Sequence, residues 1–178
     1  MNDKEAAKKA THYLYNTGCR NIIFLSTIHG TSVGNRRENG YNEAMKSLGI
    51  TAFSVYMENY LCFEETLIKV LKEKKVDAVL ASDELSAISV IKNALKHKYK
   101  IPEQLSVIGF TNGIMAENFV PSLTTVEQHA EEQGALAAEI MIKRIEKKLA
   151  APMVQEILDT TIVERESTLP VKNFNPVI

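Results

Sequence analysis

Small polar side chains follow two apolar stretches of this chain, and their chemistry suits ligand binding. Ser82 and Asp83 come at the end of the run VDAVLASD, and Thr111 and Asn112 come directly after LSVIGF. Hydroxyl, carboxylate and amide groups of this kind hydrogen-bond small polar molecules. In open α/β sheets, ligands bind outside the carboxyl ends of the strands. The sequence therefore predicts a pocket for a small polar ligand where these two segments end.

A second sequence motif would indicate a catalytic serine instead of a binding site. Residues 30–34 match G-x-S-x-G, the turn that presents a nucleophilic serine between a strand and a helix. Ser32 would then be the nucleophile, with Asp83 and His129 as nominal acid and base. The loop that contains Ser32 is long, however, and its glycines also allow a loose turn. A glycosidase needs two carboxylates that face one bond, and the strand ends offer no convincing pair. We therefore do not expect an enzyme, and a serine hydrolase is the least favoured alternative.

The residue types that bind metal ions are dispersed along the chain. No histidine pairs with another histidine or a cysteine at the spacing of a zinc site, so we expect no metal and no cofactor. Cysteines without a CxxC motif are typical of a protein in a reducing cytoplasm, which is where we expect this one. The residues concerned are His12, His29, His97, His129, Cys19 and Cys62.

Alternating strands and helices would position the polar groups. Apolar runs of strand length are separated by segments whose apolar residues recur at helical spacing. In the helix after Asp83, for example, the spacing predicts that Leu85, Ile88, Ile91 and Leu95 face inward. Such alternation is typical of an α/β fold with a parallel, doubly wound sheet and right-handed crossovers. We expect strands in 21–27, 51–57, 76–82, 105–110 and 123–128, a long helix over 129–149 and one more strand within 157–165.

Composition narrows the class of protein. With 178 residues the chain can form one ordinary domain or two small lobes. Its formal net charge of −1 does not indicate a nucleic-acid surface. No apolar run reaches the roughly 20 residues that span a membrane, and the charged start of the chain lacks the apolar centre of a signal peptide. These features favour a globular protein that acts neither on DNA directly nor in a membrane.

Several segments, taken in order, resemble the lactose-repressor family of bacterial transcription regulators. They are GCRNIIFL, RRENGY, VDAVLASDELSA, IPEQLSVIGF, PSLTTVEQ with the following GALAAE, and RESTLP, and together they span roughly residues 5–170. The resemblance implies a periplasmic-binding-protein-like (type I) fold, mostly one lobe of two. Members of this family join a DNA-binding headpiece to a two-lobed effector domain that closes on its ligand.

Compared with the family pattern, this chain begins late, which leads us to expect a shortened form. The resemblance implies a C-terminal lobe in residues 1–126, a helix and strand of the N-terminal lobe in 127–160, and a return segment with the tail in 161–178. The headpiece and most of the N-terminal lobe would be missing. The helix over 129–149 would then present an apolar stripe without its usual sheet, so we expect self-association or swapping, and a homodimer, through it.

The resemblance also assigns site residues. Arg37 stands three residues before Gly40, where the family's arginine holds sugar hydroxyls, and a guanidinium fork suits that task. Ser82 takes the place of a frequent asparagine, and Asp83 is first of all a helix cap. Thr111 and Asn112 replace the family's paired aspartates, which predicts tolerance of an anionic or differently arranged sugar. Other candidates at the cleft are Gln128, His29 and the aromatic rings of Phe110 and Phe119, although Phe110 fits a core position better.

These observations favour one function. We expect the effector-sensing part of a lactose-repressor-type transcription regulator, whose small-molecule effector is a sugar or sugar derivative. Binding would shift a two-state hinge and break no bond. DNA would be contacted only through the missing headpiece, and no membrane would be involved. The alternative from another class is a fragment of a sugar-binding protein of a transport system, which shares the fold but requires export.

Overall fold

The structure is a computed structural model that describes residues 2–58, 63–148 and 155–171. Within these residues the chain alternates strands and helices as the apolar spacing predicts, with one additional short helix, α5, in a segment for which we predicted none. The strands are β1 (Ile22–Ser26), β2 (Ser54–Tyr56), β3 (Ala78–Ala81), β4 (Ser106–Phe110), β5 (Thr124–Glu127) and β6 (Thr161–Val163). The helices are α1 (Asp3–Thr17), α2 (Ser32–Ser47), α3 (Phe63–Glu73), α4 (Glu84–Lys96), α5 (Ile114–Asn118) and α6 (Ala130–Ile145).

The strands form one sheet in the order β2-β1-β3-β4-β5-β6. The first five are parallel, and β6 returns antiparallel to β5, with Val126 opposite Ile162. The strand order reverses between β1 and β3, and in doubly wound sheets such a switch point is where ligands bind. The predicted α/β fold with a parallel, doubly wound sheet is therefore confirmed, with the antiparallel β6 added at one edge.

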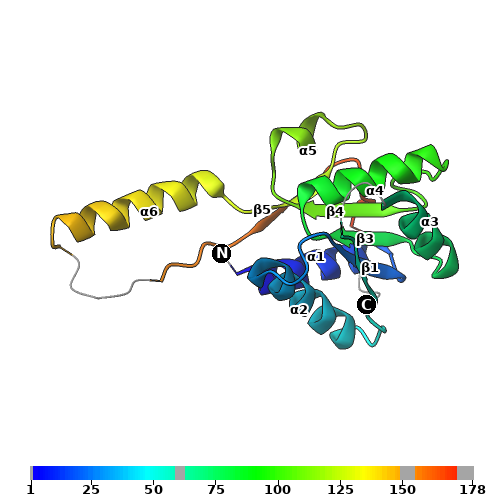
Figure 1. Cartoon of the computed structure of the whole chain (residues 1–178), viewed down its shortest axis with the longest axis horizontal. Helices are drawn as coiled ribbons and strands as arrows, with labels where there is room; N and C mark the ends of the chain where they lie inside the picture. The colour runs from blue at the N-terminus through cyan, green and yellow to red at the C-terminus, as the bar shows by residue number, and fades with distance from the viewer. Residues whose placement is uncertain (1, 59–62, 149–154, 172–178) are drawn as a thin grey trace, which may run out of the picture.

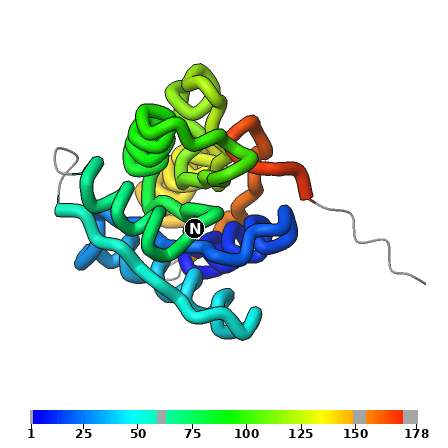
Figure 2. Tube along the Cα trace, turned by 90° about the vertical axis from the view of Figure 1, so that its right-hand side faces the viewer, coloured from blue at the N-terminus to red at the C-terminus, as the bar shows by residue number. Residues whose placement is uncertain are grey.

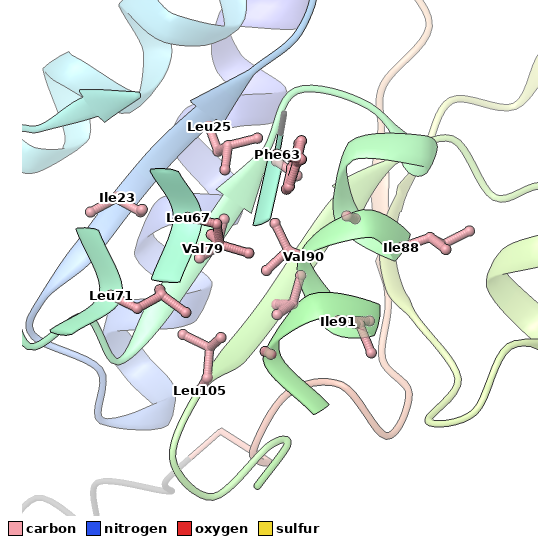
Figure 3. Close-up of a cluster of buried hydrophobic side chains, with 14 of the residues drawn as sticks. Ile23, Leu25, Phe63, Leu67, Leu71, Val79, Ile88, Val90, Ile91 and Leu105 are labelled. Atoms are coloured by element: carbon pink, nitrogen blue, oxygen red, sulfur yellow. The ribbon is translucent and has the colours of Figure 1, made fainter. Parts of the chain in front are cut away.

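Helices cover both faces of the sheet, because the strands are apolar on both sides. In Figure 1, α1 and α2 lie below the sheet and α4 lies above it. Alternate strand residues belong to two separate cores: Phe24 and Leu80 pack with α1 and α2, whereas Leu25 and Val79 pack with α3 and α4. Figure 3 shows the second of these cores, with Phe63 and Leu67 of α3 beside Val90 and Ile91 of α4. Continuous apolar strands of this kind are what a two-sided parallel sheet requires.

The buried face of α4 is not the one that we predicted from large apolar residues. Ile88 and Ile91 are buried as expected, but Leu85 and Leu95 are exposed. Small residues replace them at the sheet, among them Ala87, which lies so close to β4 that a Cβ added to Gly109 would stand 2.9 Å from the Ala87 Cβ. The small side chains of α4 thus face the sheet, where Ala87 and Gly109 allow the helix to lie close to β4.

The segment that follows β6 fastens the end of the chain to the lobe. The Ser167 hydroxyl donates to the Val107 carbonyl at 2.6 Å and accepts from the Thr124 amide at 2.8 Å. The Thr168 hydroxyl lies 2.8 Å from that of Thr124 and 3.1 Å from that of Tyr13 in α1. This segment is red in Figure 2, where it runs along the outside of the lobe. The RESTLP motif therefore joins β4, β5 and α1.

Helix α6 differs from the other long helices. It projects away from the sheet in Figure 1, and none of its 16 residues is buried. The helix predicted over 129–149 is present as Ala130–Ile145 and so ends earlier than predicted. Leu149 lies outside the described residues, as do parts of the predicted divisions 1–126, 127–160 and 161–178. In the described part of the chain, no helix is long and apolar enough to cross a membrane.

Candidate ligand site

The polar groups at the switch point between β1 and β3 are linked to one another. Asp83 caps α4, with its Oδ1 accepting from the Ser86 amide at 2.8 Å. Its Oδ2 accepts from the hydroxyls of Ser86 at 2.6 Å, Ser82 at 2.8 Å and Thr27 at 2.9 Å. Burial raises the pKa of Asp83, but these hydrogen bonds outweigh it and hold the pKa below the ordinary value of a carboxyl. Asp83 therefore remains ionised and organises the ends of both strands.

Arg37 lies beside this cluster and is held from three directions. Its Nε donates to Asp3 Oδ1 at 3.0 Å, and its Nη1 donates to the Ser82 carbonyl at 2.6 Å. The guanidinium carbon lies 3.9 Å from the centroid of the Phe110 ring, a cation–π contact. Arg37 is only 5% exposed and Asp3 only 4%. Burial lowers the pKa of Arg37, and the charges of Asp3 and Asp83 oppose that effect.

Asp3 belongs to this cluster of side chains, although the sequence analysis did not name it as a candidate. It belongs to the first turn of α1, and Asn2 is the residue whose side chain caps the helix by accepting from the Glu5 amide. The carboxylate of Asp3 is thereby free to pair with Arg37. The pair follows from the burial of Arg37, which only the structure shows, since a buried charge requires a partner of opposite sign.

At the end of β4, Thr111 and Asn112 differ in their environment. Thr111 is exposed and has a φ of 79°, a left-handed conformation that is rare for a β-branched residue. Such strain accumulates at functional positions. The Asn112 amide oxygen instead accepts from Arg165 Nη2 at 2.5 Å and from the Thr125 hydroxyl at 3.3 Å. Arg165, which the sequence analysis did not single out, also donates to the Leu123 carbonyl at 2.8 Å and so ties β4 and β5 to the return strand.

The remaining candidate residues either lie at the carboxyl ends of other strands or pack in the hydrophobic core. The side-chain Nε2 of Gln128 is buried and has no hydrogen-bond partner among the described residues, which leaves an amide donor at the crossover from β5 to α6. His29 is exposed, and its ring lies 5.3 Å from that of Tyr56 at the end of β2. Phe110 is fully buried, and Phe119 is partly buried against the core that contains residues of α3 and α4. The two phenylalanines thus act mainly in packing, as we expected for Phe110.

Ser32 occupies a regular helix start and not a strained elbow. It is the first residue of α2, and the Thr31 side chain caps that helix by accepting from the Gly34 amide. Ser32 is not among the described residues with positive φ. Gly34 is required by close packing, because an added Cβ would stand 2.2 Å from the Ile28 carbonyl oxygen. The G-x-S-x-G match is therefore explained by the cap and by this contact. Within the described residues, no group of three or more histidine, cysteine, aspartate or glutamate side chains is placed to hold a metal ion.

The fold is that of a known family. The sequence model of the periplasmic binding protein-like domain matches residues 11–168, and the chain belongs to this family. Its homologues are transcription regulators of the lactose-repressor family, and the chain corresponds to part of their effector domain, mostly one lobe of two.

Two curated relatives match this chain at nearly the same sequence identity. The ribose operon repressor of Halalkalibacterium halodurans is 30% identical over 168 residues, which are 93% of this chain and 50% of the relative. The transcriptional repressor PurR of Vibrio atlanticus is 31% identical over 179 residues, which are 98% of this chain and 52% of the relative. The chain thus spans about half the length of the curated relatives that it matches.

Solved structures agree with this assignment. The complex of the transcriptional regulator CelR with cellobiose superposes with a TM-score of 0.83 at 26% identity, over 94% of this chain and 52% of that one. A LacI-family regulator from Corynebacterium glutamicum superposes with a TM-score of 0.82 at 25% identity, over 95% of this chain and 66% of that one.

Proposed function

We propose that this lobe senses a sugar or sugar derivative for a transcription regulator of the lactose-repressor type. The observation that carries the proposal is the fixed position of Arg37 at the strand ends. Its Nε and Nη1 are bonded to Asp3 and to the Ser82 carbonyl, whereas in the described part of the chain Nη2 has no acceptor. A guanidinium that is already oriented can donate to a ligand hydroxyl without loss of its own conformational entropy.

The groups around Arg37 suit binding and not bond cleavage. Ser82 and Asp83 hydrogen-bond to each other and set the positions of the strand ends. The exposed Thr111 and the buried amide of Gln128 lie at the ends of the next two strands and would complete the polar wall. A ligand that contacts this wall and an opposing lobe would favour the closed arrangement of the two lobes, since a ligand shifts an equilibrium by its difference in affinity for the two states.

The proposal extends to partners and place of action. The bound sugar would alter the spacing of paired headpieces on DNA, so that the regulator acts as a homodimer in the cytoplasm. This lobe itself would not contact DNA, which is consistent with its net charge of −1.

A titration followed by NMR tests the site. We expect D-ribose or cellobiose to shift the backbone amide signals of Ser82, Thr111 and Gln128 in the 178-residue chain, with weak affinity because one wall of the cleft is absent. The variant Asp3→Asn/Arg37→Gln removes the ion pair without leaving a buried charge, and it should abolish these shifts.

Arg36 provides the matched control for Arg37. It is the neighbouring arginine on the same helix but is exposed, so Arg36→Gln should bind as the unaltered chain does. Sugar-induced shifts confined to other surfaces, or equal loss of binding in the Arg36 variant, would refute the proposed site.

A further inference from the structure

The guanidinium of Arg165 has a fixed position against the sheet. Arg165 follows β6, and its backbone amide donates to the Thr124 hydroxyl at 2.9 Å. The side chain extends along β5, where Nη1 donates to the Leu123 carbonyl at 2.8 Å and to the Thr125 hydroxyl at 3.3 Å. These bonds to the backbone and the side chain together determine where Nη2 lies, because the guanidinium is planar and rigid.

Nη2 of Arg165 binds the side chain of Asn112. The Asn112 Oδ1 accepts from Nη2 at 2.5 Å and from the Thr125 hydroxyl at 3.3 Å. A carbonyl oxygen has two lone pairs, so both are engaged within the lobe. The Asn112 side chain also affects Glu127: burial raises the pKa of Glu127, but the His129 amide and the Asn112 side chain hold it below its ordinary value. Asn112 therefore fastens the segment after β4 to β5.

Thr111, which lies between β4 and Asn112, needs such a fastening. Its amide still donates to the Val126 carbonyl of β5 at 3.1 Å, but its φ of 79° turns the chain out of the strand. A left-handed conformation is unfavourable for a β-branched residue and persists only where the surrounding structure imposes it. Because Asn112 is the next residue, the two bonds to its Oδ1 constrain the chain directly after this turn.

We infer that Arg165 is a positioning residue of the proposed ligand site. It holds Asn112, and Asn112 in turn keeps Thr111 in the left-handed conformation, with the exposed Thr111 side chain available to a ligand. The two neighbouring polar residues then have different roles, Asn112 as the anchor and Thr111 as the ligand contact. This inference rests on the proposed function, since only a ligand at the strand ends would use the orientation of Thr111.

NMR of the 178-residue chain without sugar tests the conformational part of the inference. At positive φ the amide and α hydrogens of a residue lie close together, so Thr111 should give a strong nuclear Overhauser cross-peak between them. Arg165→Met and Asn112→Ala should each weaken this cross-peak to the level of strand residues. Asn112→Asp keeps an acceptor for Arg165 and should retain it. A cross-peak that stays strong in Arg165→Met would overturn the inference, and Asn112→Ala decides the same question if Arg165→Met does not fold.

Titration with D-ribose and with cellobiose tests the effect on binding. Arg165→Met and Asn112→Ala should each weaken binding about fivefold, as expected for the loss of one hydrogen bond. The double variant should bind no more weakly than either single variant, since the two residues act in series. Additive losses, or unaltered affinity in both variants, would overturn the positioning role. If the unaltered chain binds neither sugar, the proposed function fails, whereas the Thr111 cross-peak still decides whether Arg165 sets this conformation.

Arg20 provides the matched control for Arg165. Its guanidinium also donates to backbone carbonyls, those of Tyr15 at 2.8 Å and Cys19 at 2.7 Å, but it precedes β1 and so lies at the opposite end of the strands. Arg20→Met should leave the Thr111 cross-peak and the sugar affinity unchanged, even where it lowers the melting temperature. An equal effect of Arg20→Met would show that a general loss of stability changes Thr111, and would overturn the inference.

Discussion

Helices α4 and α6 have similar sequence patterns but different environments. Both carry apolar residues at helical spacing, yet α4 buries Val90, Ile91 and Ala94 against the sheet, whereas α6 buries none of its residues. The helix starts also differ: Asp83 caps α4 through its side chain, whereas His129 precedes α6 with a φ of 53° and makes no side-chain cap. The comparison teaches that an amphipathic pattern indicates that a helix needs a partner, but not where the partner is found.

The largest expected difference is in the free energy of unfolding, between substitution of a core residue of the lobe and substitution of an apolar residue of α6. Leu80 is fully buried between the sheet and the helices α1 and α2. Leu80→Ala should lower the free energy of unfolding by about 3 kcal/mol, since it removes buried atoms and leaves a cavity. Ile145→Ala should change it by less than about 0.5 kcal/mol in the monomer, as is usual for exposed sites. Urea denaturation at low protein concentration measures both, and equal losses would mean that α6 belongs to the same cooperative unit.

The next effect concerns pH and is confined to the lobe. Burial raises the pKa of Tyr41 to about 12, while its hydroxyl donates to the Ile22 carbonyl and accepts from the Phe53 amide, both at 2.9 Å. The unfolded chain ionises this tyrosine near its ordinary pKa of 10. Its contribution is therefore complete below pH 10 and is lost as the pH rises toward 12, by about 3 kcal/mol in all.

Stability measured between pH 9 and 12 checks this effect. Tyr41→Phe should cost about 1 kcal/mol at neutral pH, because the Phe53 amide loses its partner. The variant should also lose less stability than the original chain as the pH rises from 10 to 12. Parallel decline of the two proteins over that interval would show that Tyr41 is not the group responsible.

A further prediction compares the two helix starts directly. Asp83→Ala removes the cap of α4 and the acceptor of three hydroxyls, so we expect a loss of about 2 kcal/mol. His129→Ala removes no cap and should cost less than about 0.5 kcal/mol. Thermal unfolding near pH 7 measures the difference. Because the pKa of Asp83 is depressed, its contribution is present above the ordinary carboxyl pKa and is lost as the pH falls through the folded value. The Asp83→Ala variant should therefore be less sensitive to acid, and unaltered acid sensitivity would contradict this assignment.

Much of the candidate site was predictable from the sequence. The residues that the sequence analysis did not identify were missed for one common physical reason. Arg37, Ser82 and Thr111 were found because strand ends and a family resemblance mark them. Asp3 and Arg165 were not found, since the groups that they bind are 34 residues and 53 residues away in sequence, at Arg37 and Asn112. The orientation of α4 was missed for a similar reason: large residues were assumed to face inward, whereas the sheet admits Ala87 because β4 has Gly109 opposite it.

The sequence by itself determined the order of strands and helices, the two-sided burial of the sheet and the family, because these depend on the local period of apolar residues and on short motifs. Only the tertiary structure decided which charged groups meet at the strand ends and which helix face is covered. Those outcomes depend on contacts between residues distant in the chain, whose geometry is set by the packing of the whole sheet and not by any local pattern.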